Sequence, residues 1–234
     1  MGRACGLVNI SSKNEAGSTM RKCGVVHLQA TLRLAMRRII LASTSPRRRE
    51  LLTQLIGNSF EIVPSAYNEL MDEELDPPSQ ALQHALGKGR DVATKYPDSV
   101  IIAADTVVSS GGILLGKPAD KEDAMSMLRM ISGRTVEVLT GIVVIDSVKG
   151  IEDTDIISTQ VRMANLSRQD IAAYVKTGEP MDKAGAFAIQ GLGAVLVEKV
   201  EGDFFNVVGL PLFRLSQMLK KVGVDVFELM QADS

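Results

Sequence analysis

From residue 36 onward, short β-branched runs alternate with longer amphipathic segments, and this order constrains the fold more than any other feature of the chain. Strand-like runs lie at residues 39–42, 100–108 and 195–200. Two more, at residues 136–145 and 151–163, are separated by a short turn and predict an adjacent strand pair. Strands that alternate with helices and also include such a pair predict an α/β fold, with a mixed, twisted sheet and flanking helices.

The helix-like segments have recognisable beginnings. Ser45 and Pro46 predict the N-cap and the first position of a helix over residues 46–56. Further helices are expected at residues 79–96, 120–131, 167–176 and 212–222. Gly87 and Gly89 are expected to weaken the first of these, because glycine is a poor helix former.

The ends of the chain differ from the middle. Residues 1–35 are basic, poor in acids and without a sustained hydrophobic period. We interpret them as an N-terminal extension, disordered or a non-native start, with Met36 as the natural first residue; an organellar targeting segment is the alternative. Residues 36–223 are expected to form the functional domain and residues 224–234 a C-terminal tail.

Composition excludes several classes of protein. The net charge of −2 leaves no general basic footprint, so no nucleic-acid partner is expected. No apolar run reaches the length of about 20 residues that spans a bilayer, so no membrane association is expected. The two cysteines, Cys5 and Cys23, have no metal-ligand spacing and form no disulfide framework. A reducing, cytoplasmic location is therefore expected.

A strand–turn–helix segment at residues 41–50 carries the first candidate binding residues. A helix N-terminus presents free N–H groups and a positive dipole to an anion. Ser43 adds a hydroxyl group there, and Arg47 and Arg48 add guanidinium groups that match phosphate oxygens. The segment predicts a phosphate-binding loop, and an ordinary capped helix with solvated arginines is the alternative.

Acidic and cationic candidates follow. Asp105 lies among apolar residues, near the expected end of a strand, where a buried carboxylate has to be paired or metal-bound. It could hold Mg²⁺ or accept a proton from water. Lys117, in a Gly-Lys-Pro turn, could place a cation on a triphosphate. The alternatives are a turn-capping aspartate and an ordinary turn lysine, and Glu69 alone indicates nothing.

Small residues surround one cation and one amide in the segment at residues 182–191. Such a segment lets the backbone approach a ligand closely. Lys183 could then meet phosphate and Gln190 could recognise a polar edge, although a glycine-rich connecting loop is the alternative. His27 and His84 lie beside no motif, which argues against a histidine-based triad.

Together these motifs resemble the Maf family of nucleotide pyrophosphatases. The Ser-x-Ser-Pro-Arg-Arg segment and the Asp-Lys-Ala-Gly…Ile-Gln-Gly segment are specific in combination. The matching stretches run in family order across nearly all of residues 37–220, at 40–52, 104–108, 116–118, 132–134, 140–141, 179–193 and 206–212.

The resemblance implies two lobes around a central cleft, usually in a homodimer. It implies cleavage of a nucleoside triphosphate between the α- and β-phosphates, with a divalent metal cation, Mg²⁺ or Mn²⁺, as cofactor. By its matching position Asp105 is implied as the catalytic residue, and Glu69 and Asp105 as the metal ligands. The implied substrate-binding residues are Ser43, Arg47, Arg48, Lys117, Lys183 and Gln190.

One branch of the family prefers dTTP and UTP, and another prefers 7-methyl-GTP. The segments at residues 182–191 and 206–212 look like the first branch, so we expect dTTP and UTP to be hydrolysed to monophosphate and pyrophosphate, removing unwanted nucleotides. The chain departs from the family pattern at Asn68, at Gly87-Lys88-Gly89 and at Val136. The alternatives are a non-catalytic protein that senses nucleotides or acts in cell division, and an enzyme for inosine-type nucleotides.

Overall fold

The computed structural model describes residues 37–70, 72 and 74–232. The N-terminal extension expected at residues 1–35 lies outside these residues. Among the described residues, no helix is both long enough and apolar enough to cross a membrane.

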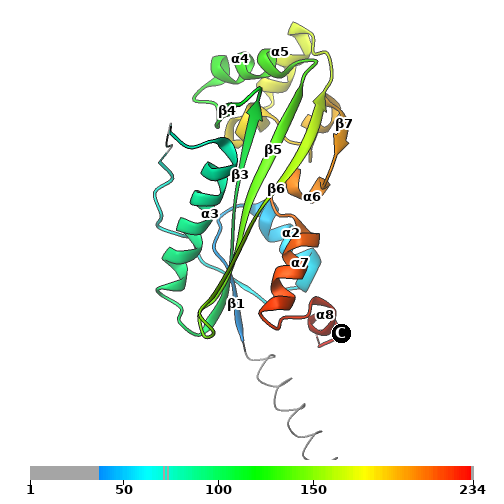
Figure 1. The fold of residues 1–234 in the computed structure, drawn as a ribbon. Helices are drawn as coiled ribbons and strands as arrows, with labels where there is room; N and C mark the ends of the chain where they lie inside the picture. Colours follow the sequence, from blue (N-terminus) through cyan, green and yellow to red (C-terminus); the bar gives the residue numbers. More distant parts are fainter. Residues whose placement is uncertain (1–36, 71, 73, 233–234) are drawn as a thin grey trace, which may run out of the picture. The chain divides into compact units, whose positions relative to one another are not determined.

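A seven-stranded sheet runs through the described part of the chain (Figure 1). The strands lie in the order β2-β1-β3-β5-β6-β7, and β4 pairs with β3. Their bounds are β1 Arg38–Leu41, β2 Glu61–Ile62, β3 Ser99–Ser110, β4 Ile113–Leu115, β5 Thr135–Asp146, β6 Ile151–Met163 and β7 Val197–Glu201. β1 is parallel to β2 and β3, whereas the other pairings are antiparallel, which confirms the mixed sheet.

Helices cover both faces of this sheet (Figure 1). Their bounds are α2 Pro46–Ile56, α3 Pro77–Ala93, α4 Lys121–Ile131, α5 Arg168–Lys176, α6 Phe204–Val208, α7 Leu212–Lys221 and α8 Val226–Ala232. Three short 3-10 turns lie between α5 and β7: η1 Glu179–Asp182, η2 Ala184–Ala186 and η3 Leu192–Leu196. As predicted, Pro46 begins α2, and the Ser45 side chain accepts a hydrogen bond from the N–H of Arg48.

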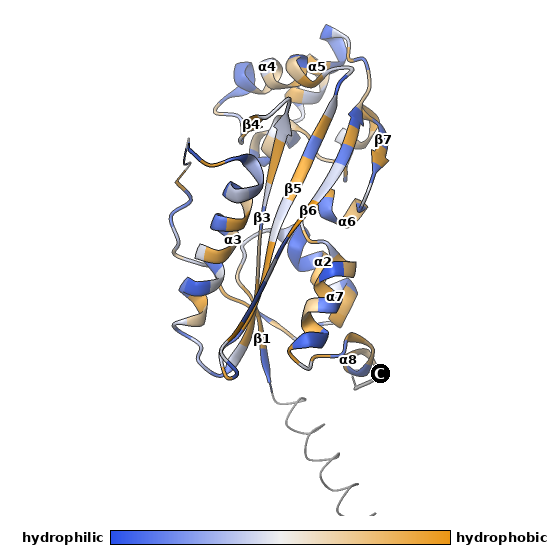
Figure 2. Cartoon of the chain, in the orientation of Figure 1, coloured by the Kyte–Doolittle hydropathy of each residue, from blue (hydrophilic) through white to orange (hydrophobic). Residues whose placement is uncertain are grey.

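Side-chain alternation along β3 divides the core. Ile101 and Ala103 pack with α3 residues on one face. Ile102 and Ala104 pack with residues of α2 and α7 on the other. A separate cluster joins α4 and α5 to the far ends of the long strands, and Figure 2 shows the apolar sides of the helices turned towards the sheet. The strands β3, β5 and β6 therefore run through two lobes.

A difference in strand length leaves a gap beside β3. The strand β1 pairs with residues 99–102 of β3, and β4 pairs with residues 108–110. Residues 103–107 therefore have no strand beside them on that edge in the described part of the chain, although β5 pairs with them on the other. This gap positions the cavity described below.

The helix expected at residues 79–96 is present as α3 and runs without interruption through Gly87 and Gly89, and the weakening by these glycines stays a prediction. A Cβ at Gly87 would lie 2.2 Å from the Tyr67 ring, so the missing side chain makes room for that ring. The segment interpreted as a C-terminal tail contains α8, and Val224 and Val226 are buried in the core beside α2 and α7.

Candidate active site

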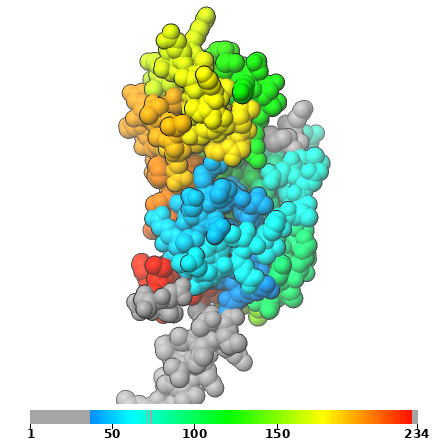
Figure 3. Space-filling model, turned by 180° about the vertical axis from the view of Figure 1, so that it is seen from behind, coloured from blue at the N-terminus to red at the C-terminus, as the bar shows by residue number. Residues whose placement is uncertain are grey.

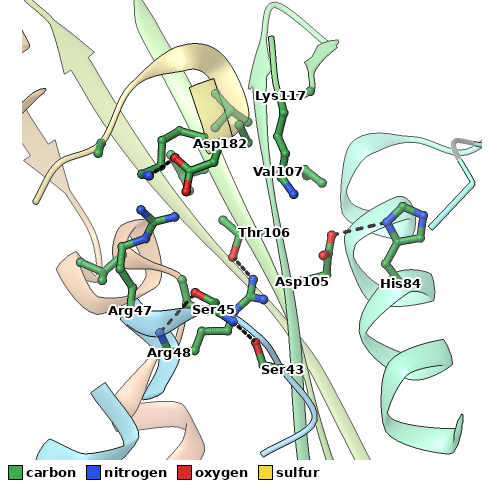
Figure 4. Close-up of a pocket in the computed structure, with 18 of the residues that line it drawn as sticks. Ser43, Ser45, Arg47, Arg48, His84, Asp105, Thr106, Val107, Lys117 and Asp182 are labelled. Atoms are coloured by element: carbon green, nitrogen blue, oxygen red, sulfur yellow. Dashed lines mark hydrogen bonds and ion pairs between the residues drawn. The ribbon is translucent and has the colours of Figure 1, made fainter. Parts of the chain in front are cut away.

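A cavity of about 630 Å³ opens at the gap beside β3. Its walls come from the loop after β1, the start of α2, the middle of β3, α3, the turn after β4 and the loop around η2 (Figure 4). Seen from behind, the blue segment near the start of the described chain lies below the yellow segment that contains η1 and η2 (Figure 3). The cavity has a volume typical of small-molecule sites. All of the site residues predicted from the sequence line it: Ser43, Glu69, Arg47, Arg48, Asp105, Lys117, Lys183 and Gln190.

The N-terminus of α2 forms a cationic wall. The Ser43 hydroxyl accepts a hydrogen bond of 3.1 Å from the N–H of Ser45, which shapes the loop. Arg48 donates from Nε to the carbonyl of Gly209 at 2.9 Å and from Nη2 to the hydroxyl of Thr106 at 3.0 Å. Burial lowers the pKa of Arg48, while the charges of Asp105 and Glu69 oppose that shift. Both hydrogen-bond partners are neutral, so neither bond compensates the positive charge of Arg48, which lines the cavity.

Two lysines also line the cavity. Lys117 follows β4 and points into the cavity (Figure 4). Lys183 forms an ion pair with its neighbour Asp182, and this hydrogen bond is the main reason that the pKa of Asp182 lies below its usual value. The cavity therefore collects cations from α2, from the turn after β4 and from the loop after η1, as a polyphosphate requires.

Asp105 lies in the middle of the 12-residue strand β3 rather than near its end, so the expected position was wrong. The β-branched run continues as strand on both sides of Asp105, whose side chain is only 10% exposed. Lys88 of α3 places its Nζ 2.6 Å from Asp105 Oδ1 and 2.8 Å from Glu69 Oε1. His84, one helical turn earlier, has Nδ1 3.5 Å from Asp105 Oδ2.

These contacts keep Asp105 charged. Burial by itself would raise the pKa of Asp105. The contact with His84 and the charges of Lys88 and Arg48 outweigh burial, and the pKa lies below its usual value. The same contact is the main reason that the pKa of His84 is raised. A carboxylate with a low pKa is a weak base, so it is better suited to hold a cation or orient water than to remove a proton by itself.

Sequence reasoning assigned no role to Lys88 or His84, because His84 lies beside no motif and Lys88 was noted only within the Gly87-Lys88-Gly89 departure from the family pattern. Their spacing of four residues puts them on one face of α3, together with the buried residues Ala81 and Ala85. Gly141 of β5 allows this helix to approach the sheet, because a Cβ there would lie 2.5 Å from the carbonyl oxygen of Ala81. The helical spacing was the available signal, and the close approach was not visible in the sequence.

The acidic wall fits a divalent cation. Ligand atoms of Glu69, His84 and Asp105 all lie within 4.8 Å of one another. Carboxylate oxygens suit Mg²⁺ and Mn²⁺, and an imidazole nitrogen suits transition metals. The ammonium of Lys88 already contacts both carboxylates, so a cation would share these oxygens with Lys88 or take its place.

Known proteins match most of this chain. The chain is 53% identical over 193 residues to the dTTP/UTP pyrophosphatase of Methanosarcina mazei, a match that covers 82% of this chain and 98% of the relative. It is 50% identical over 193 residues to the protein of the same name from Methanococcoides burtonii, covering 82% and 99%. The protein of that name from Caldicellulosiruptor saccharolyticus is 46% identical over 197 residues, covering 82% and 98%.

The sequence model of one family, described as Maf-like protein, matches residues 38–222. That range holds every residue of the cationic and acidic walls, and it runs from the first strand of the sheet to the end of α7. With this match and relatives of 46–53% identity, the chain belongs to the Maf family.

Proposed function

We propose that this protein hydrolyses nucleoside triphosphates, with dTTP and UTP as preferred substrates, to the nucleoside monophosphate and pyrophosphate. The observation that carries the proposal is that one cavity holds cationic side chains from three segments opposite a buried carboxylate that stays charged. The names of the relatives, dTTP/UTP pyrophosphatase, support the choice of substrate.

The cationic wall is proposed to bind the phosphates, and the acidic wall to orient the attacking water. Ser43, Arg47 and Arg48, with Lys117 and Lys183, bind the phosphates and neutralise the charge that builds on their oxygens during in-line displacement. Asp105 orients the attacking water towards the α-phosphorus, and Lys88 and His84 hold Asp105 in place. Positioning and electrostatics supply most of the acceleration in such reactions, and no covalent intermediate is needed.

Glu69 and Asp105 are the proposed ligands of a divalent metal cation, Mg²⁺ or Mn²⁺, and His84 is within reach as a third. A cation bound there would stabilise negative charge on the phosphate oxygens. The chain's own contribution is to hold the two carboxylates close to each other, each in contact with Lys88. The homodimer, the cytoplasmic location and the lack of a nucleic-acid partner remain predictions.

Gln190 is proposed to recognise the base. It lines the cavity together with Ala188 and Ile189. An amide both donates and accepts hydrogen bonds, and uracil and thymine present both kinds of group. A site that depends on such bonds rejects a base that leaves them unmade. The Gln190→Ala variant should therefore lose kcat/KM for dTTP and UTP selectively, whereas an equal loss for every nucleotide would indicate a structural role.

A nucleotide panel tests the function directly. Pyrophosphate release is measured for dTTP, UTP, CTP, GTP and 7-methyl-GTP with Mg²⁺, with Mn²⁺ and with excess chelator. We expect dTTP and UTP to give the highest kcat/KM, and the chelator to abolish turnover until metal is restored. A preference for 7-methyl-GTP would overturn the assigned branch, and full activity in chelator would overturn the metal requirement. Binding without turnover would favour a nucleotide sensor.

A further inference from the structure

Glu179 lies just outside the cavity and holds one of its walls. It is the first residue of η1 and does not line the cavity itself. Its Oε2 accepts a hydrogen bond of 2.9 Å from the N–H of Leu192, and its Oε1 accepts one of 2.9 Å from the N–H of Gly193. One carboxylate thus holds two successive backbone amides at the end of the loop that contains Gln190.

Tyr174 of α5 holds the other end of the same loop. Its hydroxyl donates to Glu179 Oε1 at 3.0 Å and accepts a hydrogen bond of 3.2 Å from the N–H of Ala188. The ring is buried, so its position is fixed by the core of the α4–α5 lobe. The loop is therefore fixed at Ala188 and at residues 192–193, and two of the three residues between these points, Ile189 and Gln190, line the cavity.

Two glycines in this loop fit the same arrangement. Gly191 has a φ of 89°, and a Cβ there would lie 2.8 Å from Glu179 Oε2. A Cβ at Gly193 would lie 2.3 Å from the carbonyl oxygen of Ala188 and 2.6 Å from the hydroxyl oxygen of Tyr174. Both positions need glycine because the carboxylate and the hydroxyl lie against the loop backbone.

The charge on Glu179 suits this role. Burial opposes ionisation, but the N–H groups of Gly193 and Leu192 and the hydroxyl of Tyr174 outweigh it, so the pKa of Glu179 lies below its usual value. The pKa of Tyr174 is raised, first by burial and then by its hydrogen bond to Glu179, so Tyr174 remains a donor. Hydrogen bonds to an ionised acceptor are stronger than those between neutral groups.

We propose that Glu179 is a positioning residue for base recognition: with Tyr174 it fixes residues 188–193 so that Gln190 is presented to the nucleobase. This inference rests on the proposed function, because it assigns the loop to the base rather than to the phosphates. It places specificity in two residues that need not touch the substrate.

Amide hydrogen exchange tests the structural half of the proposal without any activity. In Glu179→Ala, protection of the Leu192 and Gly193 amides should fall by roughly tenfold or more, since both lose the carboxylate that accepts their hydrogen bonds. The exchange of β3 and β5 should be unchanged. Glu198→Ala is the matched control, because Glu198 is an exposed glutamate of β7 that pairs with Arg162. Unchanged protection in Glu179→Ala would overturn the proposal.

Calorimetry with dTMP and with inorganic pyrophosphate tests the functional half. In Glu179→Ala the affinity for dTMP should fall roughly tenfold, the equivalent of losing about one hydrogen bond to the base, while pyrophosphate affinity stays the same. The milder variants Glu179→Gln and Tyr174→Phe should show the same selectivity with a smaller loss. Because Gln presents an N–H group to a backbone N–H, it cannot replace both acceptors.

The outcomes separate this inference from the catalytic proposal. Equal loss of dTMP and pyrophosphate in a folded variant, no loss of either, or a wild-type protein that binds pyrophosphate but not dTMP would each overturn the role of Glu179. The catalytic proposal would be overturned, and the role of Glu179 would stand, if the wild type bound dTMP but hydrolysed no triphosphate while Glu179→Ala lost affinity for dTMP alone.

Discussion

At the scale of single residues, Asp105 illustrates how a carboxylate can be nearly buried in a strand and remain charged. The Asp105→Asn variant keeps the shape of the side chain and removes its charge. We expect kcat to fall by roughly 10²–10⁴-fold, because the charged group that orients water or holds metal is lost. The fold should survive, since a neutral amide is easier to bury. The rates are measured by pyrophosphate release and the fold by circular dichroism.

Asp153→Asn is the control for Asp105→Asn. Asp153 lies on β6 of the same sheet, where it pairs with Lys221 at 2.9 Å, and it does not line the cavity. Its variant should retain activity. Full activity in Asp105→Asn would move the water-orienting role elsewhere, and Glu69 would be the next residue to replace.

Lys88 sets the charge of the acidic wall. The Lys88→Met variant removes the cation shared by Glu69 and Asp105 and leaves two carboxylates facing each other. We expect it to bind Mn²⁺ more tightly than the wild type, because the metal no longer competes with an ammonium group. Electron paramagnetic resonance of free Mn²⁺ measures this, with Lys95→Met as the control because Lys95 pairs with Asp91 away from the cavity. Weaker binding would mean that Lys88 organises the carboxylates rather than competing for them.

The site was only partly predictable at this scale. Ser43, Arg47 and Arg48 could be predicted because a strand, a turn and a capped helix are contiguous in the sequence, and the anion-binding property follows from that local geometry. Lys88 and His84 are part of the site only because α3 crosses the sheet at Asp105. That crossing is a tertiary contact, and a single sequence carries no direct signal for it.

At the scale of secondary-structure elements, the packing of α3 on β5 depends on one glycine. In Gly141→Ala the new methyl group would lie 2.5 Å from the Ala81 carbonyl oxygen, and backbone atoms cannot move aside cheaply. We expect a loss of about 1–3 kcal/mol of stability from overpacking, together with loss of activity as His84 and Lys88 move away from Asp105. Thermal unfolding and pyrophosphate release measure the two effects.

Gly116→Ala is the control for thermal unfolding, because a Cβ there would have no atom within 4 Å apart from its chain neighbours, and the φ of Gly116 is not positive. Its Tm should match that of the wild type. A Gly141→Ala variant with unchanged stability and activity would show that α3 can shift without disturbing the acidic wall.

The long elements were predictable from periodicity and the short ones were not. The runs expected at residues 136–145 and 151–163 became β5 and β6 with nearly the same bounds, and α2 begins and ends where predicted. The strand expected at residues 195–200 starts later, because residues 192–196 form a 3-10 turn held by Glu179. β4, α6 and α8 were not predicted, since elements this short depend on tertiary contacts rather than on their own pattern.

At the scale of the whole molecule, Asp146 connects segments that are far apart in the sequence, and its ionisation should make stability depend on pH. It is fully buried, forms an ion pair with Arg37 and accepts hydrogen bonds from the N–H groups of Val148 and Lys149. Arg37 also donates to the carbonyl of Val222, beyond the end of α7. Burial opposes ionisation, but these contacts outweigh it, and the pKa of Asp146 lies below its usual value.

The lowered pKa of Asp146 determines the direction in which the free energy of unfolding changes with pH. The stabilisation by Asp146 is fully present above its unfolded pKa of about 3.9 and is lost as pH falls through the lower, folded value. We expect Asp146→Asn to lose about 1–3 kcal/mol at neutral pH and to show a shallower decline of stability below about pH 4. Urea unfolding between about pH 3 and pH 8, a range that brackets the unfolded pKa, measures the loss of stability and its dependence on pH. The control is Glu198→Gln, because Glu198 is exposed. If Asp146→Asn lost stability below about pH 4 as steeply as the wild type, other carboxylates would cause the loss of stability in acid.

The unpaired stretch of β3 has a consequence for how this fold could diversify. An open strand edge elsewhere invites other chains to associate with it. Here Asp105, Thr106 and Val107 of this stretch line a cavity whose other walls are helices and loops, so a small molecule can reach the edge more easily than a strand can. The width of the opening is set by where β1 stops and where β4 starts. Lengthening either strand would narrow the opening and would also move residues that line it, because Ala42 and Ser43 follow β1 and Leu114 and Leu115 belong to β4. In this fold the size of the ligand and its contacts are therefore set by the same strand ends.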